Sequence, residues 1–180
     1  MKATVYIATS VDGFIARENG GLDWLPGGGE AVGEEDYGYQ EFMDSVDALV
    51  MGRYTFEQVL SFGSWPYGKT PVVVLSHREV NIPDAIAKTV SSMSAPPREL
   101  VLRLGEKGFE HLYIDGGKTI QGFLKEGLIN QLIITKVPIL LGTGIPLFGP
   151  LVQDVSLRLL ETRQFDSGFV QTKYEVLHAQ

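Results

Sequence analysis

The stretch LYIDGGKTIQGF, residues 112–123, decides the fold, because a short apolar run breaks at two glycines and then continues with helical periodicity. This order predicts a strand, a tight turn and a helix. The first backbone N–H groups of that helix have no partner within it, and they carry the positive end of the helix dipole. The stretch therefore predicts a phosphate site at Gly116 and Gly117. Lys118 adds a cation there and Thr119 adds a hydroxyl donor.

The composition limits the chain to a few classes of protein. Its 180 residues are enough for one domain with a sizeable core, and no shift in composition divides residues 1–180. Cysteine is absent, which excludes thiol catalysis, iron–sulfur clusters and cysteine zinc sites. His77, His111 and His178 do not follow the spacing of metal ligands, so no metal is expected.

The charge and the N-terminal segment restrict the partners. A net charge of −7 disfavours nucleic acid, although a local basic pocket still suits a phosphorylated small molecule. The first residues are too few and too interrupted by polar side chains for a secretory leader or a membrane span. We therefore expect a cytoplasmic protein that acts on a small-molecule substrate and has no membrane partner.

Apolar runs and helical periodicity alternate along the chain, which predicts an α/β domain with three layers. Continuous apolar runs suit central strands that are covered on both faces. Residues 155–177 predict a hairpin that turns at Asp166, Ser167 and Gly168. We expect a mixed, mainly parallel central sheet with this antiparallel hairpin at its C-terminal end. The other predicted strands are residues 3–8, 47–51, 71–76, 111–115 and 131–137, and the predicted helices are residues 34–45, 55–60, 97–104 and 119–126.

Two further predicted strands end in residues that suit an anion. Gly52 is followed by Arg53, whose guanidinium binds phosphate through two hydrogen bonds, and by Thr55, which is placed to cap a helix. Because the carboxyl ends of parallel strands lie at one edge of a sheet, these residues converge with the glycine pair. Two arginines and a helix N-terminus suit a pyrophosphate with one more phosphate, as in NADPH. The other strand end reads Leu75, Ser76, His77 and Arg78.

Two common nucleotide-binding motifs are absent. Gly117, Lys118 and Thr119 resemble the end of a Walker loop, but Leu112 stands where that motif requires glycine. No G-x-G-x-x-G run follows a predicted strand, so the dinucleotide fingerprint fails as well. A plain turn is the alternative explanation of the paired glycines, and an exposed position after a strand is the alternative for each arginine.

Six blocks of sequence, in this order and spacing, resemble the dihydrofolate reductase-like fold. Within it they are most similar to the reductase domain of the bifunctional riboflavin-biosynthesis deaminase/reductase, and the resemblance covers nearly the whole chain. It implies an NADPH-dependent reductase that delivers a hydride to a small heterocyclic or phosphoribosyl substrate, and it implies a homodimer. The blocks are ATSVDGFIA (8–16), DW (23–24), DALVMGRYT (47–55), VVVLSHR (72–78), LYIDGGKTI (112–120) and LLGTGIPLF (140–148).

The resemblance also implies which residues contact NADPH. All of them lie at or near the ends of predicted strands. They are Gly52, Arg53 and Thr55 for the phosphates, Leu75, Ser76, His77 and Arg78 for the adenosine end with its 2′-phosphate, Gly116, Gly117, Lys118, Thr119 and Ile120 for the pyrophosphate, and Ala8, Gly13 and Ile15 for the nicotinamide.

The proton donor is the residue that the sequence defines least. Dihydrofolate reductases carry an acid on the first helix, and counting back from Gly52 places Asp36 near that position. Acids at the start of a helix also interact favourably with its dipole, which is a purely structural reason for Asp36. Ser10 and Asp12 lie beside the expected nicotinamide edge, where they either orient the substrate or close a turn with Gly13.

Two tryptophans are candidate substrate contacts. Trp24 and Trp65 stand in loops rich in glycine and proline, where a large aromatic side chain either walls a substrate pocket or packs against the core.

Two other functions stay open alongside the reductase. Without a clear acid, the chain could bind a nucleotide or a flavin without turnover, or it could reduce dihydrofolate itself. The apolar run at residues 137–141 is our candidate for the homodimer interface, and burial in the core explains that run equally well.

Overall fold

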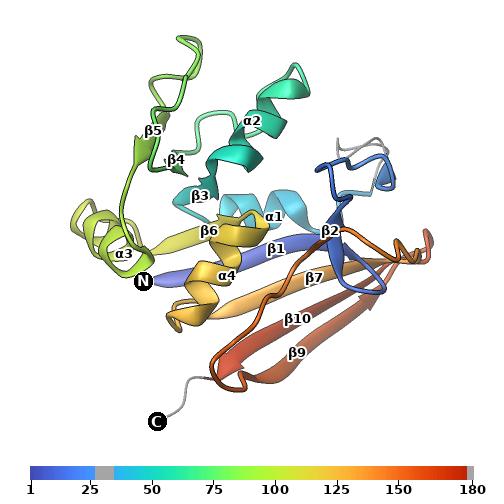
Figure 1. Ribbon diagram of the computed structural model, residues 1–180. Helices are drawn as coiled ribbons and strands as arrows, with labels where there is room; N and C mark the ends of the chain where they lie inside the picture. Colours follow the sequence, from blue (N-terminus) through green and yellow to red (C-terminus); the bar gives the residue numbers. More distant parts are fainter. Residues whose placement is uncertain (27–34, 178–180) are drawn as a thin grey trace.

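A computed structural model describes residues 1–26 and 35–177 (Figure 1). Within these residues, eight strands form one sheet in the order β5-β4-β3-β6-β1-β7-β10-β9, and β2 pairs separately with β8. β10 is antiparallel to β7 and β9, whereas the other neighbours in the large sheet are parallel. The strands are β1 (Lys2–Ser10), β2 (Phe14–Ala16), β3 (Ala48–Gly52), β4 (Val72–Leu75), β5 (Val90–Met93), β6 (His111–Asp115), β7 (Gln131–Val137), β8 (Ile145–Pro146), β9 (Ser156–Gln164) and β10 (Val170–Leu177).

Helices cover both faces of this sheet. They are α1 (Tyr39–Asp44), α2 (Arg53–Ser61), α3 (Pro97–Glu106) and α4 (Gly117–Lys125). Because successive strand residues point to opposite faces, neighbouring positions enter different cores. Val50 and Ile114 belong to the buried cluster that contains α3 and α4 side chains, whereas Leu49 and Tyr113 belong to the cluster with α1 and α2. The predicted three-layer α/β domain with a mixed, mainly parallel sheet is confirmed.

The predicted C-terminal hairpin is confirmed as well. β9 and β10 pair from Ser156 opposite Leu177 to Gln164 opposite Val170, with one irregularity at Lys173 and Tyr174. Gly168 closes the turn at a φ of 84°, and its N–H donates to the Phe165 carbonyl at 2.9 Å. A φ in this range favours glycine, so the turn position is explained by the sequence.

The helix predicted over residues 34–45 is wrong at its N-terminal end. Residue 34 lies outside the described residues, and α1 begins only at Tyr39. Tyr37 and Gly38 have φ values of 57° and 79°, which an α-helix does not accommodate. Asp36 therefore lies in a turn before the helix, where its carboxylate accepts the backbone N–H groups of Gly38 at 2.9 Å and Gln40 at 3.1 Å.

Three short strands were not predicted from the sequence. β5 has the sequence VSSM and lies at the sheet edge, so it lacks the continuous apolar pattern of the central strands. β2 and β8 depend on each other, with Phe14 opposite Pro146 and Ala16 opposite Ile145. This pairing brings the two blocks around residues 8–16 and 140–148 side by side, although they are far apart in the sequence.

The apolar run at residues 137–141 is mostly internal. Val137 is buried in a small cluster with Trp24 and Phe169, and Ile139 and Leu141 pack against it. Leu140 alone of these residues is an exposed large hydrophobic side chain. Along the part of the chain that the structure describes, no helix is long and apolar enough to cross a membrane.

Candidate functional site

The starts of α2 and α4 lie against each other at the carboxyl edge of β3 and β6. A Cβ atom built on Gly116 would lie 2.4 Å from the Thr55 hydroxyl oxygen, and one built on Gly52 would lie 3.1 Å from the Thr119 hydroxyl oxygen. Gly116 also has a φ of 89°, which favours glycine. Each glycine thus admits the threonine of the other helix, and this reciprocal contact brings the two helix N-termini together.

Neither of these helices is capped by a side chain among the described residues. The first N–H groups of each helix lack intrahelical partners, so both ends carry unsatisfied donors and a positive dipole end. Two such ends at one edge of a parallel sheet form a site that suits an anion with several oxygens. The predicted strand, glycine turn and helix at residues 112–123 have this arrangement.

A large cavity opens over this edge, with a volume of about 1530 Å³. That volume exceeds the roughly 300–1,000 Å³ of a site for one small molecule, so two ligands fit side by side. Most of the predicted cofactor contacts line it. They are Ala8, Ile15, Gly52, Arg53, Thr55, Leu75, Ser76, His77, Arg78, Gly116, Gly117, Lys118 and Thr119.

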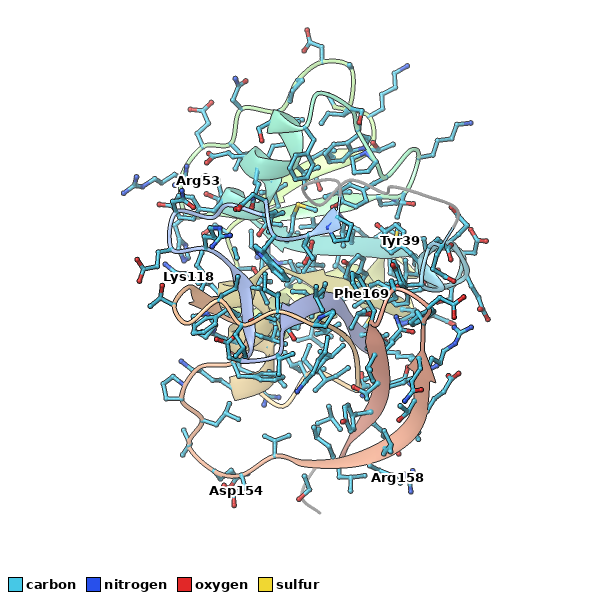
Figure 2. The ribbon with its side chains drawn as sticks, turned by 90° about the vertical axis from the view of Figure 1, so that its right-hand side faces the viewer. Tyr39, Arg53, Lys118, Asp154, Arg158 and Phe169 are labelled. Atoms are coloured by element: carbon cyan, nitrogen blue, oxygen red, sulfur yellow. The ribbon has the colours of Figure 1, made fainter. Side chains whose placement is uncertain are left out.

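The cationic side chains of the cavity lie at its helix-start end. Arg53 opens α2, donates to the Glu57 carboxylate at 2.6 Å and lies 4.6 Å above the centre of the Tyr54 ring. Lys118 lies in the first turn of α4, and Arg78 follows β4. Figure 2 shows Arg53 and Lys118 together on one side of the molecule, with Tyr39 and Phe169 on the other.

Aromatic side chains form the opposite end of the cavity, and we call this the aromatic end. Five of its six rings are tyrosines, and backbone and amide groups satisfy two of their hydroxyls. The Tyr6 hydroxyl donates to the Tyr37 carbonyl and the Tyr113 hydroxyl to the Tyr6 carbonyl, each at 2.9 Å. Burial raises the pKa of Tyr6 to about 12, so its hydroxyl keeps its proton at neutral pH. The rings belong to Tyr6, Tyr37, Tyr39, Tyr67, Tyr113 and Phe169.

Asp115 lines the cavity where its two ends meet, at the last position of β6. Its carboxylate accepts the backbone N–H of Gly116 at 2.8 Å, and the structure gives it no cationic partner among the described residues. Burial raises the pKa of Asp115 from 3.8 to about 6, against a smaller opposite effect of the Gly116 hydrogen bond. A carboxyl with such a pKa is partly protonated near neutral pH, which suits a proton donor.

Sequence reasoning missed Asp115, although the signal was present. An acid at the end of a continuous apolar strand, directly before the glycine turn, stands at the ligand edge of an α/β sheet. The three acid–base candidates taken from the sequence, Ser10, Asp12 and Asp36, lie in other surroundings.

Ser10 and Asp12 close the turn that leads into β2. The Ser10 hydroxyl oxygen accepts the Phe14 N–H at 3.0 Å. Asp12 is exposed and accepts the N–H groups of Leu141 at 3.1 Å and Gly142 at 2.8 Å, and hydrogen bonds from Ser10 and these groups hold its pKa below the usual range. Neither residue lines the cavity as the described residues form it. The third candidate, Asp36, does line it, but its two backbone donors lower its pKa as well.

Four other predicted contacts are placed away from the cavity lining. Gly13 bends the chain before β2, and Ile120 is fully buried in the α4 core. Trp24 is buried against Val137 and Phe169. Trp65 packs edge-to-face on Phe56 and on Tyr67, with ring centres 5.9 and 5.0 Å apart. The two tryptophans thus support the walls of the cavity from behind.

The fold and the cavity define a reductase-like domain of the dihydrofolate reductase-like fold, and comparison with known proteins names the family. The chain belongs to the RibD C-terminal domain family, whose model matches residues 2–171. It is 37% identical over 175 residues to the uncharacterized protein YwjB of Bacillus subtilis strain 168, an alignment that covers 96% of this chain and 97% of YwjB.

Two solved structures support this placement. The putative riboflavin biosynthesis protein from Shewanella sp. PV-4 is 42% identical, with a TM-score of 0.91 over 99% of this chain and 100% of that one. The Thermotoga maritima diaminohydroxyphosphoribosylaminopyrimidine deaminase/5-amino-6-(5-phosphoribosylamino)uracil reductase shares the fold, with a TM-score of 0.72 and 16% identity over 98% of this chain and 56% of that one. Family and fold are those of RibD-like reductases, which indicates an oxidoreductase.

The contact between Gly116 and Thr55 predicts a specific effect of substitution. Gly116→Ala adds a Cβ both at positive φ and 2.4 Å from the Thr55 hydroxyl oxygen. We expect it to lower the free energy of unfolding by about 2 to 4 kcal/mol in urea denaturation. Gly108→Ala is the matched control, because Gly108 has a φ of 87° with no atom within 4 Å of the added Cβ. It should lose only about 1 to 2 kcal/mol, and equal losses would show that the close approach is unimportant.

The pKa of Asp115 predicts how stability depends on pH. The folded protein holds the Asp115 proton more tightly than the unfolded chain, so the wild type loses stability as pH rises from 3.8 to about 6, and the loss persists above that. Asp115→Asn removes this loss. In urea denaturation, the variant should gain about 1 to 3 kcal/mol over the wild type between pH 4 and pH 7.5.

The control for this measurement is Asp154→Asn, which removes an exposed carboxylate in the loop before β9 (Figure 2). Its difference from the wild type should be the same at both pH values. The same constancy for Asp115→Asn would show that Asp115 is ionised as easily in the folded protein as in the unfolded chain.

Proposed function

We propose that this protein is an NADPH-dependent reductase that transfers a hydride to a small planar heterocycle. The observation that carries the proposal is one cavity with two chemically different ends, a cationic end at two uncapped helix starts and an aromatic end with a buried acid between them. Membership of the RibD C-terminal domain family supports the reductase class.

The residues of the cationic end fit NADPH. Gly52 and Gly116 let the starts of α2 and α4 pack closely together, so the free N–H groups of both starts can bind one pyrophosphate. Arg53 and Lys118 would offset its charge. We propose that Ser76, His77 and Arg78 take the adenosine end, where the Arg78 guanidinium suits a 2′-phosphate. Ala8 and Ile15 also line the cavity, and Ile15 lies against the start of α4 at Gly117.

Bound NADPH supplies a hydride, and the substrate must also gain a proton to complete the reduction of a C=N or C=C bond. We assign that proton to Asp115. The hydride forms the new C–H bond, the π pair moves to the neighbouring ring atom, and the Asp115 carboxyl gives its proton to that atom. The carboxylate that remains accepts the Gly116 N–H and recovers a proton from water before the next cycle.

The position of Asp115 supports turnover among the functions that the sequence left open. A protein that only binds a nucleotide or a flavin has no use for a partly protonated carboxyl between two ligand subsites. Turnover is therefore the favoured reading, and reduction of dihydrofolate remains the second candidate because a pterin is also a planar heterocycle. The absence of cysteine suits the reducing cytoplasm, where we propose that the protein acts.

Replacing Arg53 by Ala tests the cofactor site. The variant should raise the NADPH dissociation constant about 10- to 150-fold in calorimetric titration, which corresponds to about 1.5 to 3 kcal/mol for a hydrogen bond to a charged group. The wild type should bind NADH much more weakly than NADPH.

Arg103→Ala is the matched control, because Arg103 also pairs with an acid one helical turn away, Glu99, but lies on α3 outside the cavity. It should leave NADPH affinity unchanged. Equal affinity of the wild type and Arg53→Ala would remove Arg53 from the site, and a wild type that binds neither nucleotide would refute the proposed reductase.

We also propose that the protein forms a homodimer, with β9 rather than residues 137–141 at the interface. β9 is an edge strand, and every one of its residues is exposed. An antiparallel copy centred on Thr162 would place each Glu161 opposite an Arg163 of the other copy. The apolar side chains exposed around this edge include Leu157, Leu159, Leu160 and Leu177. Such a strand is open to pairing with a like strand.

Substitution at β9 tests this interface. Light scattering of the wild type at micromolar concentration should give about twice the chain mass of 19.8 kDa, and Leu159→Lys should give the single chain mass. Leu140→Lys is the control from the run at residues 137–141 and should stay dimeric. A dimer broken by Leu140→Lys but not by Leu159→Lys would assign the interface to that run, and a monomeric wild type would exclude the dimer.

A further inference from the structure

We infer that the substrate of this protein is a planar heterocycle that is neutral or cationic and carries no phosphate group. This inference rests on the proposed function and narrows its substrate class. It comes from the distribution of charge within the cavity, which differs sharply between the cationic end and the aromatic end.

The aromatic end is built to take a flat ring. Tyr39 and Phe169 both lie at this end, one on α1 and the other just before β10 (Figure 2). Tyr6 packs on Tyr39 edge-to-face at 5.4 Å between ring centres, and Tyr37 stacks on Phe169 at 5.1 Å. These mutual contacts hold the rings in place, so a planar ligand meets a surface that is already ordered.

The polar groups of the aromatic end are acidic or neutral. Glu35, Asp36 and Asp115 line it as acids, and Thr135 as a hydroxyl. Thr135 is held by the Gln171 amide at 2.9 Å. A ligand here meets carboxylates that accept N–H groups, which suits amino and ring N–H donors of a heterocycle.

Cations are confined to the other end. Among the described residues that line the cavity, the side chains able to hold a positive charge are Arg53, His77, Arg78 and Lys118, and all of them stand at the helix starts or just after β4. Residues 27–34 do not change this balance, because their sequence contains two glutamates and no lysine, arginine or histidine. In the proposed complex, the three phosphates of NADPH occupy the cationic end.

Arg163 is a cation close to the aromatic end, next to Gly38. Its guanidinium lies 5.8 Å from the centre of the Phe165 ring and 3.7 Å from the Glu161 carboxylate, and it does not line the cavity. It also helps to keep the pKa of Asp36 low, so acids already surround it. A phosphate at the aromatic end would thus meet Glu35 and Asp36, and Arg163 is not among the described residues that line the cavity.

A phosphate dianion buried without cationic partners loses its hydration and gains no charged hydrogen bonds in return. We therefore expect a phosphorylated heterocycle to be disfavoured by at least about tenfold against the same heterocycle without the phosphate. The deaminase/reductase of Thermotoga maritima is named for a phosphoribosyl substrate, so this protein would differ from it in substrate and share its fold.

The test uses matched pairs of compounds with and without phosphate. The full chain, saturated with NADPH, is mixed with 5-amino-6-(5-phosphoribosylamino)uracil or its dephosphorylated form, and separately with flavin mononucleotide or riboflavin. Turnover is followed as loss of NADPH absorbance, and binding by ligand-observed NMR. We expect the member without phosphate to have at least about a tenfold higher kcat/KM or affinity within a pair.

A charge reversal provides the second readout. Glu35→Lys places a cation at the aromatic end and should narrow the preference within each pair several-fold. Glu106→Lys makes the same change in net charge at the exposed end of α3, outside the cavity, and should leave the preference unchanged. Equal effects of the two variants would mean that the preference reflects overall charge, and would overturn the inference.

The remaining outcomes separate this inference from the proposed function. If the phosphorylated members are turned over equally well or better, the inference fails and the reductase stands. If NADPH binds but no member of either pair binds or reacts, the aromatic end is not a site for such rings and the inference fails, while the cofactor site stands. If NADPH does not bind, the proposed function fails, and NMR binding of the pairs without cofactor still reports on the aromatic end.

Discussion

The close approach of two glycines and two threonines at the sheet edge is the constraint on which the rest of the site depends. Gly116 admits the Thr55 hydroxyl, and Gly52 admits the Thr119 hydroxyl. With any side chain at Gly116, the start of α2 would have to move away from the start of α4, and the two dipole ends would no longer face one region of space. The small size of the two glycines therefore determines where the anion site forms.

Much of the fold follows from local sequence because its central elements are simple. β3, β4 and β6 are built on continuous apolar runs, and glycine or polar residues follow each run and end the strand. Positions that depend on distant partners were not predictable in this way. β2 forms because Ile145 and Pro146 pair with it. α1 starts later than predicted because Tyr37 and Gly38 adopt positive φ values, which the acidic sequence before them does not indicate.

The site shows the same division between local and distant information. The strand ends with glycine and arginine were recognisable, since the chemistry and the position are both written in a few consecutive residues. The position of Asp115 at a strand end was also readable, but its raised pKa was not, because that pKa comes from burial, beside aromatic side chains contributed by α1 and the loop after α2. Trp24 and Trp65 were predicted as substrate contacts but lie behind the cavity wall. The local sequence around a loop tryptophan is the same whether its ring faces a cavity or packs against the core.

The place of β1 in the sheet has a consequence for how the chain acquires its fold. β1 is the first strand in the sequence, yet its neighbours are β6 and β7, with Lys2 opposite His111 and Thr4 opposite Gln131. During synthesis, residues 11–110 must emerge after β1 before either partner exists, and the loop that closes is correspondingly long. β1 therefore stays unpaired on the nascent chain until β6 has been made. During that time its apolar residues are open to misassociation and to binding by chaperones.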